Sequence, residues 1–325
     1  ALLQEVVARM QRHLGKSGFI FRLGGDEFLS LIQHPEEMEL VVEEGERLLT
    51  ELQRPYWINS HEIRLDASIG VVDQSFPSIE ELLQAGDIAM YAAKEVGGRV
   101  QPWSPELINR EARRSNIERE LRNIRDRHGN EFQLWYQAIV DLQSSSKVVG
   151  TEALLRWESG PLGGWVSPGE FIPIAERSGE IYKISNWVLK TAAKQAGLWD
   201  CAFPISVNVS PWDLEQGTFV ADLVATCNSL GVNLSCLSLE ITERAIAANL
   251  RYYAANLREL SRLRVSLKVD DFGAGDSGLR RLLDAPCQAV KIDRSLVPLN
   301  VNDTDRRLLC RSIVKLTKDL NIKTI

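Results

Sequence analysis

Two adjacent carboxylates, Asp270 and Asp271, end a short apolar segment of this chain and are followed at once by a glycine-rich turn. Further along, Lys291 stands between apolar neighbours in a second short segment, which ends at Asp293. Carboxylate oxygens bind divalent cations, and a lysine beside them can balance the charge of a phosphate. The region from 263 to 293 is therefore the first place where we expect phosphate chemistry.

Three earlier strand-like segments also end in a side chain that carries an oxygen ligand. These side chains are Glu152, Asn208 and Glu240, and each follows a short, mainly apolar run. The stretches between such runs have helical spacing, so strands and helices alternate from about residue 132 onward. This alternation predicts an α/β sheet covered by helices.

The two-residue period of a strand divides the side chains of these segments between two faces. In the last four segments the apolar residues share one face, and the other face carries Asn208, Glu240, Asp270 and Lys291. Apolar side chains outward and polar side chains inward are the pattern of a (β/α)8-type barrel, whose functional groups gather at the carboxyl ends of its strands. We therefore predict such a barrel for residues 131–325, with its site on that rim.

Three carboxylates, an amide and a lysine on one rim predict a metal centre. Carboxylates held this close repel one another unless cations lie among them, and structural ion pairs are the alternative. Oxygen ligands without histidine or cysteine favour Mg²⁺ or Mn²⁺. Two adjacent aspartates allow a pair of ions to be held side by side, which suits metal-assisted attack of water on a phosphodiester.

The first hundred residues contain a second pair of acids. Asp26 and Glu27 follow Gly24 and Gly25 between two apolar segments, which predicts a hairpin with the acids at its tip. Such a tip can hold a metal ion beside a nucleotide phosphate. On spacing alone, a plain polar turn is the simpler alternative.

The string Arg-Leu-Gly-Gly-Asp-Glu-Phe at 22–28 resembles the signature of the GGDEF family of diguanylate cyclases, and the helical segment 87–94 resembles a later part of that domain. The resemblance implies a nucleotidyl-cyclase-like α/β fold with a site for GTP, if the domain is complete, formed by Arg22, Asp26, Glu27 and Lys94. In that site Asp26 would bind a metal ion, and Arg22 and Lys94 would contact phosphates.

Part of that family's pattern is missing. The first half of its domain, with a second metal-binding aspartate and the guanine-reading residues, would precede Ala1. Its product-inhibition motif would fall on 15–18, where Gly15 and Gly18 replace a cation and a carboxylate. We therefore expect residues 1–103 to be a partial GGDEF domain.

The string Glu-Ala-Leu-Leu-Arg-Trp at 152–157 resembles the signature of EAL-domain phosphodiesterases, which hydrolyse cyclic di-GMP to linear pGpG. Further segments resemble that family in the same order along the chain: 135–137, 167–173, 207–210, 240–243, 270–273 and 291–293. The resemblance implies an α/β barrel with an antiparallel first strand, cyclic di-GMP as the ligand, and a homodimer. It also implies two Mg²⁺ or Mn²⁺ ions, held by Glu152, Asn208, Glu240, Asp270 and Asp271.

The same resemblance assigns the remaining site residues. Lys291 would position the attacking water or balance phosphate charge, Asp271 would serve the second ion, and Glu243 would brace the loop after Phe272. The residues that would contact the dinucleotide are Gln137, Arg156 and Asp293.

Lys268 departs from the family's pattern, because it replaces a small or apolar residue on the lumen face two positions before Asp270. Its ammonium either satisfies a carboxylate of the metal centre or is held lower in the barrel by another acid. The loop 273–278 also departs, with an added glycine and aspartate. A receptor that binds cyclic di-GMP without turnover is therefore an alternative. A bifunctional cyclase–phosphodiesterase is a further alternative. The family's late glutamate would follow Ile325, so we expect the domain to be C-terminally incomplete.

Residues 104–130 are expected to connect the two domains as one helix that begins at Ser104-Pro105. Its apolar stripe is narrow and is formed by Leu107, Ile108, Ile117, Leu121 and Ile124. Such a stripe predicts a solvated connector, and a helical pairing surface is the alternative.

The composition of the 325 residues, 44% hydrophobic and 25% charged, is that of a globular protein, and the length suggests two domains. The net charge of −6 argues against binding duplex nucleic acid. No apolar run approaches the roughly 18 residues of a membrane span, so we expect a cytoplasmic protein or the cytoplasmic portion of a membrane-anchored one. Five cysteines without close metal-type pairs predict free thiols in a reducing compartment.

Overall fold

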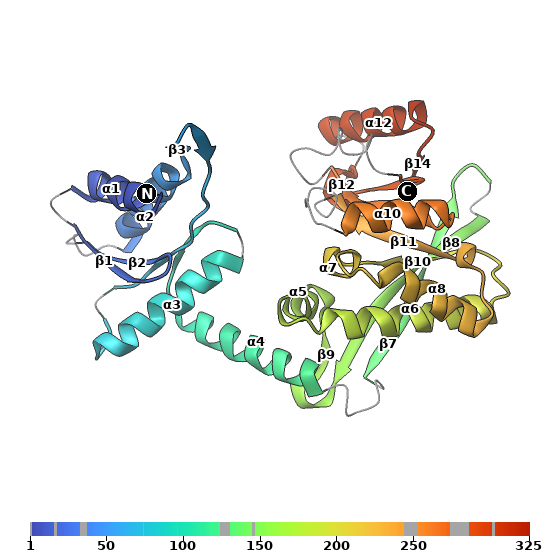
Figure 1. The fold of residues 1–325 in the computed structure, drawn as a ribbon, viewed down its shortest axis with the longest axis horizontal. Helices are drawn as coiled ribbons and strands as arrows, with labels where there is room; N and C mark the ends of the chain where they lie inside the picture. Colours follow the sequence, from blue (N-terminus) through green and yellow to red (C-terminus); the bar gives the residue numbers. More distant parts are fainter. Residues whose placement is uncertain are drawn as a thin grey trace. The chain divides into compact units, whose positions relative to one another are not determined.

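The computed structural model describes residues 2–15, 18–32, 38–73, 75–95, 97–123, 131–144, 147–243, 252–273, 286–300 and 303–325. The chain divides into two compact units, Ala1–Ser115 and Asn116–Ile325 (Figure 1). Among the described residues, no helix combines the length and the apolar character that crossing a membrane requires.

The first unit contains short sheets and helices. Its elements are α1 (Leu2–Leu14), β1 (Gly18–Gly24), β2 (Glu27–Ile32), α2 (Met38–Gln53), β3 (Tyr56–Ile58), β4 (His61–Ile63), β5 (Ile69–Val71), α3 (Ile79–Glu95) and β6 (Val100–Pro102). Strands β1 and β2 form the predicted antiparallel hairpin, and Gly25 at its tip has a φ of 48° that glycine adopts without strain. Apolar side chains of α1 and α2, among them Met10 and Leu48, pack with Tyr56 in the main core of this unit.

Helix α4 (Pro105–Asn123) forms most of the predicted connector, and residues 124–130 lie outside the described residues. The expectation of a mainly solvated helix is wrong at three positions. Leu107 is buried with α3, and Ile117 and Leu121 lie in the core of the second unit. The division between the units falls inside this helix, so the domain limits 1–103, 104–130 and 131–325 stay a prediction.

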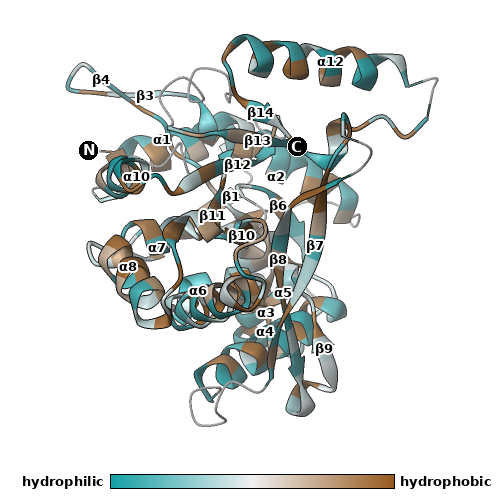
Figure 2. Ribbon diagram, turned by 90° about the vertical axis from the view of Figure 1, so that its right-hand side faces the viewer, coloured by the Kyte–Doolittle hydropathy of each residue, from teal (hydrophilic) through white to brown (hydrophobic). Residues whose placement is uncertain are grey.

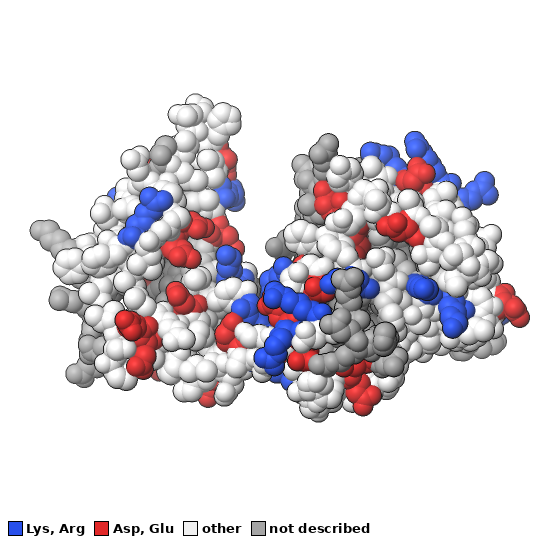
Figure 3. Space-filling view, turned by 60° about the horizontal axis from the view of Figure 1, so that its bottom comes forward, with Lys and Arg blue, Asp and Glu red and all other residues white. Residues whose placement is uncertain are grey.

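Charged side chains of both signs cover the rest of this helix. Arg114 pairs with Glu111 at 2.6 Å, and Arg122 pairs with Glu118 one turn away. Figure 3 shows basic and acidic side chains interspersed over the face that it presents. These two ion pairs lie within the helix, where i,i+3 and i,i+4 pairs add modest stability.

The second unit alternates strands and helices. Its elements are β7 (Phe132–Asp141), β8 (Lys147–Ser159), η3 (Gly160–Leu162), β9 (Gly164–Val166), α5 (Pro168–Ser178), α6 (Ile181–Leu198), β10 (Ile205–Asn208), α7 (Pro211–Leu214), α8 (Phe219–Leu230), η4 (Leu234–Cys236), β11 (Leu237–Thr242), α10 (Tyr253–Arg262), β12 (Ser266–Phe272), β13 (Ala289–Ile292), η5 (Arg294–Leu296), α12 (Thr304–Asp319) and β14 (Lys323–Thr324). The predicted alternation is confirmed.

One curled sheet organises the second unit. Its strand order is β14-β13-β12-β11-β10-β8-β7, with β9 paired to β8 beside this path. Strand β7 is antiparallel to β8, and strands β8, β10, β11, β12, β13 and β14 are parallel to one another. The short strand β9 is antiparallel to β8. The fold class, an α/β barrel-type sheet with an antiparallel first strand, is confirmed. Within the described residues the sheet is a partial barrel whose edge strands are β7 and β14.

The outer face of this sheet packs against helices, as the two-residue period predicts. Its buried apolar side chains include Ile205, Val207, Leu237, Leu239, Leu267 and Val269. Helix α6 contributes Ala192, Ala193 and Ala196, all fully buried, and these small side chains let the helix approach the sheet closely. Figure 2 shows helix α8 and strand β11 as rich in hydrophobic residues. The polar inner face is thereby left free for the site.

Cys201 and Cys236 form a disulfide with their Cα atoms 5.2 Å apart, whereas Cys227, Cys287 and Cys310 are free. The prediction of free thiols is therefore wrong for the first pair. The two cysteines lie 35 residues apart in sequence, just before β10 and β11 respectively. These are neighbouring parallel strands, and their pairing brings the two cysteines together.

Candidate functional site

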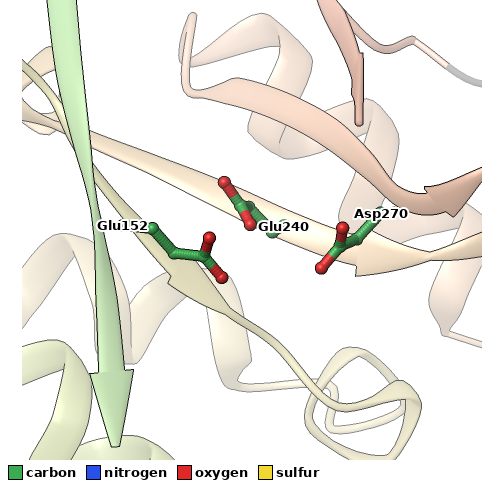
Figure 4. Close-up of side chains that lie close together, drawn as sticks. All are labelled: Glu152, Glu240 and Asp270. Carbon is green, nitrogen blue, oxygen red and sulfur yellow. The ribbon is translucent and has the colours of Figure 1, made fainter. Parts of the chain in front are cut away.

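Three carboxylates from three strands meet on the inner face of the sheet. Glu152 on β8, Glu240 on β11 and Asp270 on β12 place ligand oxygens within 4.8 Å of one another (Figure 4). We call these three residues the acidic cluster. Its members come from strands far apart in sequence, and the parallel register brings their carboxyl groups together. An acidic cluster of this kind can hold a hard divalent cation.

Lys291 lies at the centre of the acidic cluster. Its Nζ lies 2.9 Å from Glu152 Oε2, 2.6 Å from Glu240 Oε2 and 3.1 Å from Asp270 Oδ1. Burial disfavours the charged ammonium, but the attraction of the carboxylates outweighs burial and raises the pKa of Lys291. The ammonium thus occupies the place that a bound cation would take among these oxygens.

Glu240 is the most deeply buried acid of the cluster, with 1% of its surface exposed. Among the described residues, no donor makes a hydrogen bond to its Oε1 atom, which is buried. Burial raises the pKa of Glu240, and the charge of Lys291 opposes that shift. A buried carboxylate oxygen without a donor is costly unless a cation binds it. The residues present therefore fit a divalent ion with oxygen ligands.

Lys268 lies beneath the acidic cluster and is also buried. Its ammonium contacts Ser206 Oγ and lies 3.6 Å from Glu240 Oε1. Burial lowers the pKa of Lys268 and the charge of Glu240 opposes that change. The acid that holds Lys268 is thus a member of the cluster itself. When all five groups are ionised, the three carboxylates and the two ammonium groups sum to one net negative charge.

Asn208 lies beside the cluster at the end of β10. Its Nδ2 donates to Glu152 Oε1 at 2.9 Å, so its Oδ1 is the atom suited to a metal ion. The predicted group of Glu152, Asn208, Glu240 and Asp270 is therefore brought together by the structure. Their roles as metal ligands stay predictions.

A buried polar turn fixes the backbone after Asn208. Ser210 caps helix α7 in a capping box with Asp213, whose carboxylate accepts from the Ser210 amide at 3.1 Å and from Ser185 Oγ at 2.6 Å. Ser210 Oγ in turn donates to Glu176 Oε1 at 2.6 Å. Burial raises the pKa of Asp213 to about 6. We did not predict this network from the sequence, although the Ser-x-x-Asp spacing at 210–213 is a capping signal that indicates it.

Asp271 and Glu243 lie close to the cluster but outside it. Asp271 has a φ of 54°, is exposed, and donates its amide to Asp270 Oδ1 at 3.0 Å. Glu243 Oε2 accepts from the Gly273 amide at 2.9 Å, directly after Phe272, and the bracing role of Glu243 stays a prediction. Gly273 has a φ of 92°, a conformation that strains any residue with a side chain, so this turn favours glycine. The second-metal role of Asp271 stays a prediction.

The three predicted ligand-binding residues differ in their surroundings. Gln137 is exposed and is the cross-strand partner of Glu152. The Arg156 guanidinium lies over the Trp135 ring at 5.4 Å from its centroid. Asp293 accepts from the Ser295 amide at 2.8 Å and caps η5. Hydrogen bonds from the Ser295 hydroxyl and from this amide lower the pKa of Asp293. Gln137 and Arg156 thus lie along β7 and β8, whereas Asp293 is engaged in a turn.

In the first unit, the predicted GGDEF residues lie on the surface. Arg22 closes the hairpin turn by donating from Nε and Nη2 to the Gly25 carbonyl at 3.1 and 2.7 Å. Asp26 and Glu27 are exposed at the tip of this turn, and Lys94 is exposed in the last turn of α3. Their roles toward a nucleotide stay predictions.

Known families match both units. Residues 1–99 match the family "Diguanylate cyclase, GGDEF domain", and residues 118–325 match the EAL domain. A Pseudomonas aeruginosa protein described as "Bifunctional diguanylate cyclase/cyclic di-GMP phosphodiesterase MucR" is 33% identical over 100% of this chain and 48% of its own length. An uncharacterized signaling protein of Caulobacter vibrioides is 34% identical over 100% of this chain and 40% of its own length. The chain thus spans less than half the length of these two curated relatives.

A solved structure resembles the second unit. It is described as "PaMucR Phosphodiesterase, c-di-GMP complex", shares 32% sequence identity, and superposes with a TM-score of 0.58 over 64% of this chain and 84% of that one. The sheet order, the antiparallel first strand and these matches agree with one another. The chain therefore belongs to the EAL domain family, and a GGDEF domain region precedes its EAL domain.

Proposed function

We propose that the second unit binds cyclic di-GMP and that the complete protein hydrolyses it to linear pGpG in a two-metal site. The observation that carries this proposal is the acidic cluster around Lys291, in which Glu240 Oε1 is buried without a hydrogen-bond donor among the described residues. A relative's solved structure is described as a phosphodiesterase in complex with c-di-GMP, which supports this ligand. An acidic site binds a polyanionic ligand only when cations bring the charges into balance.

Glu152, Glu240, Asp270 and the Asn208 amide oxygen would hold one Mg²⁺ or Mn²⁺ ion, and Asp271 would help to hold a second. When bound, these ions would neutralise phosphate charge and activate water for in-line attack on the phosphodiester. Lys291 would then turn its ammonium from the carboxylates toward the phosphate. Glu243 would keep the Gly273 turn in place, and thereby the backbone that carries both aspartates.

A receptor that binds cyclic di-GMP without hydrolysis is a second candidate. The observation that favours it is Lys268, whose ammonium lies 3.6 Å from Glu240 Oε1, the oxygen that is suited to a metal ion. A fixed cation there offsets part of the charge that attracts a divalent ion. In this second function the fold and the ligand would be the same, and only turnover would be absent.

Binding and turnover separate these candidates in one experiment. Cyclic di-GMP binding is measured by calorimetry with Mg²⁺, with Mn²⁺ and with a chelator, and the products are analysed by chromatography. The phosphodiesterase is supported by linear pGpG that forms only with metal. Binding without product supports the receptor, and turnover that persists in chelator contradicts the two-metal site. Glu259→Gln serves as the matched control, because Glu259 is an exposed acid on α10 outside the cluster.

For the first unit we propose a GGDEF nucleotide site formed by Arg22, Asp26, Glu27 and Lys94, with GTP as its ligand when the domain is complete. We also propose that the protein is a cytoplasmic homodimer, or the cytoplasmic portion of a membrane-anchored one. Light scattering on the purified chain tests the dimer, and GTP titration of a protein extended at its N-terminus tests the nucleotide site.

A further inference from the structure

Two tryptophans lie half exposed on β7 and β9, the two strands that are antiparallel to β8, which carries Glu152. Trp135 on β7 and Trp165 on β9 expose 53% and 52% of their surfaces. Their ring centroids are 5.9 Å apart and the rings meet edge to face at 72°. Large aromatic side chains that contact each other and still face solvent are typical of binding surfaces, because their flat faces offer much contact area at little entropic cost.

Strand register places both tryptophans on the face that carries Glu152. Gln137 pairs with Glu152, and Trp135 pairs with Leu154. Side chains two residues apart share a face, so Trp135 lies one step, about 7 Å, from the partner of Glu152. On β9, Trp165 pairs with Glu158, which also shares the face of Glu152. Figure 1 shows β7 and β8 as long strands that run side by side toward β9.

A tight turn brings Trp165 back over β8. Gly163 and Gly164 have φ values of 87° and 118°, which glycine adopts without the cost that a side chain would add. The chain therefore reverses after η3 and pairs β9 with the end of β8. The opposite face of these strands is closed, since Phe132 and Trp157 pack there in the core.

Arg156 lies on β8 on the same face as the two rings. Its guanidinium is 5.4 Å from the Trp135 ring centroid, and its Nη1 donates to the Leu155 carbonyl at 2.9 Å. We call Trp135, Arg156 and Trp165 the aromatic wall. Indole rings stack on nucleobases, and an adjacent guanidinium adds cation–π contact and charge for a nearby phosphate.

We propose that the aromatic wall is a stacking subsite for one purine base of the cyclic dinucleotide whose phosphate lies at the acidic cluster. This inference rests on the proposed function and adds Trp135 and Trp165 to the ligand-binding residues. The wall continues the strands that carry Gln137 and Glu152, so one ligand can span both places. A flat base can lie against one indole and meet the edge of the other.

Alanine at either tryptophan tests the wall in the full chain. For Trp135→Ala and Trp165→Ala we expect cyclic di-GMP to bind about 5- to 100-fold more weakly by calorimetry, with Mn²⁺ affinity retained. Trp135→Phe keeps a ring and should restore most of the affinity. Trp57→Ala is the matched control, because Trp57 is 68% exposed and lies in the first unit. In steady-state kinetics the wall variants should raise KM more than they lower kcat.

Two results would overturn the subsite. Equal affinity of wild type and both alanine variants, with all proteins folded by thermal melting, would show that no base stacks on the wall. Weakened Mn²⁺ binding in the wall variants would show that the tryptophans act on the metal centre instead. A wild-type chain that binds Mn²⁺ but no cyclic di-GMP would overturn the proposed function itself, and the subsite with it.

Discussion

The chain carries two groups of acids, and the structure places them in different surroundings. Asp26 and Glu27 are exposed at the tip of a two-stranded hairpin. The nearby Arg22 donates both of its described hydrogen bonds to the Gly25 carbonyl of the same turn. Glu152, Glu240 and Asp270 come from three parallel strands and surround Lys291. A hairpin tip gathers residues that are neighbours in sequence, whereas a parallel sheet gathers strand ends from distant parts of the chain. A pair of acids in the sequence therefore does not by itself indicate a metal site. Carboxylates that the fold brings together from several strands do.

The largest expected effect comes from removing the buried acid of the cluster. Glu240→Gln keeps the shape of the side chain but removes its charge, so metal binding and hydrolysis should fall together. Loss of groups that merely orient a metal ligand costs about 10- to 100-fold, so loss of a ligand should cost more than about 100-fold in kcat/KM. Calorimetry with Mn²⁺ and pGpG formation measure both. Retained activity in Glu240→Gln beside an unaffected Glu259→Gln would remove Glu240 from the metal centre.

Lys291 tests whether the cluster is held by charge. Lys291→Met leaves the carboxylates without their central cation, and an uncompensated buried charge costs about 3–5 kcal/mol. We expect a loss of that order in the free energy of unfolding without metal, and partial recovery with Mg²⁺, since an ion that binds the folded state stabilises it. Lys183→Met is the control, because Lys183 pairs with Glu180 at 2.6 Å on a surface where such pairs contribute at most about 1 kcal/mol. Equal losses in the two variants would contradict the prediction.

The turn after Asn208 should respond to pH, unlike the exposed hairpin tip. The pKa of Asp213 is raised from 3.8 to about 6 by burial, so the folded state binds more protons than the unfolded chain between these values. Stability should therefore fall as pH rises from about 4 to 6, by at most about 3 kcal/mol. Asp213→Asn should flatten this slope in urea unfolding curves. Parallel curves for wild type and variant would show that Asp213 does not titrate in this window.

Lys268 sharpens the distinction between enzyme and receptor. Lys268→Met keeps the apolar stem and removes the charge that lies 3.6 Å from Glu240 Oε1. We expect Mn²⁺ to bind about tenfold more tightly, a gain of about 1.4 kcal/mol that is well within the interaction of charges at this separation. Calorimetry measures the affinity and product analysis follows hydrolysis. An unchanged affinity would make Lys268 a structural residue that only satisfies Ser206 and Glu240.

The smallest effect is expected at the hairpin tip. Asp26→Asn removes a carboxylate that is exposed on the surface of the first unit. Surface substitutions of this kind change the free energy of unfolding by less than about 0.5 kcal/mol. Cyclic di-GMP hydrolysis should also stay at the wild-type level, since the acidic cluster lies in the second unit. A large loss in either measurement would show that the two groups of acids depend on each other.

Several features could be predicted from the sequence because they depend on local order. The two-residue period placed Asn208, Glu240, Asp270 and Lys291 on one face, and neighbouring strands preserved that face through their register. Glycines at the hairpin tip predicted the turn between β1 and β2. Local chain geometry determines such features, so they do not depend on how the rest of the chain folds.

The tertiary structure alone decided which groups are partners. Cys201 meets Cys236, and Lys268 meets Ser206 and Glu240, only because distant strands pair in one particular register. Burial of Ile117 in the connector likewise depends on the core that forms against the helix. The sequence determined which residues could face the lumen, and the lateral order of the strands determined which of them touch. The reason is that the two-residue period of a strand is a local property, whereas strand pairing depends on contacts between segments far apart in sequence, which form only when the sheet folds.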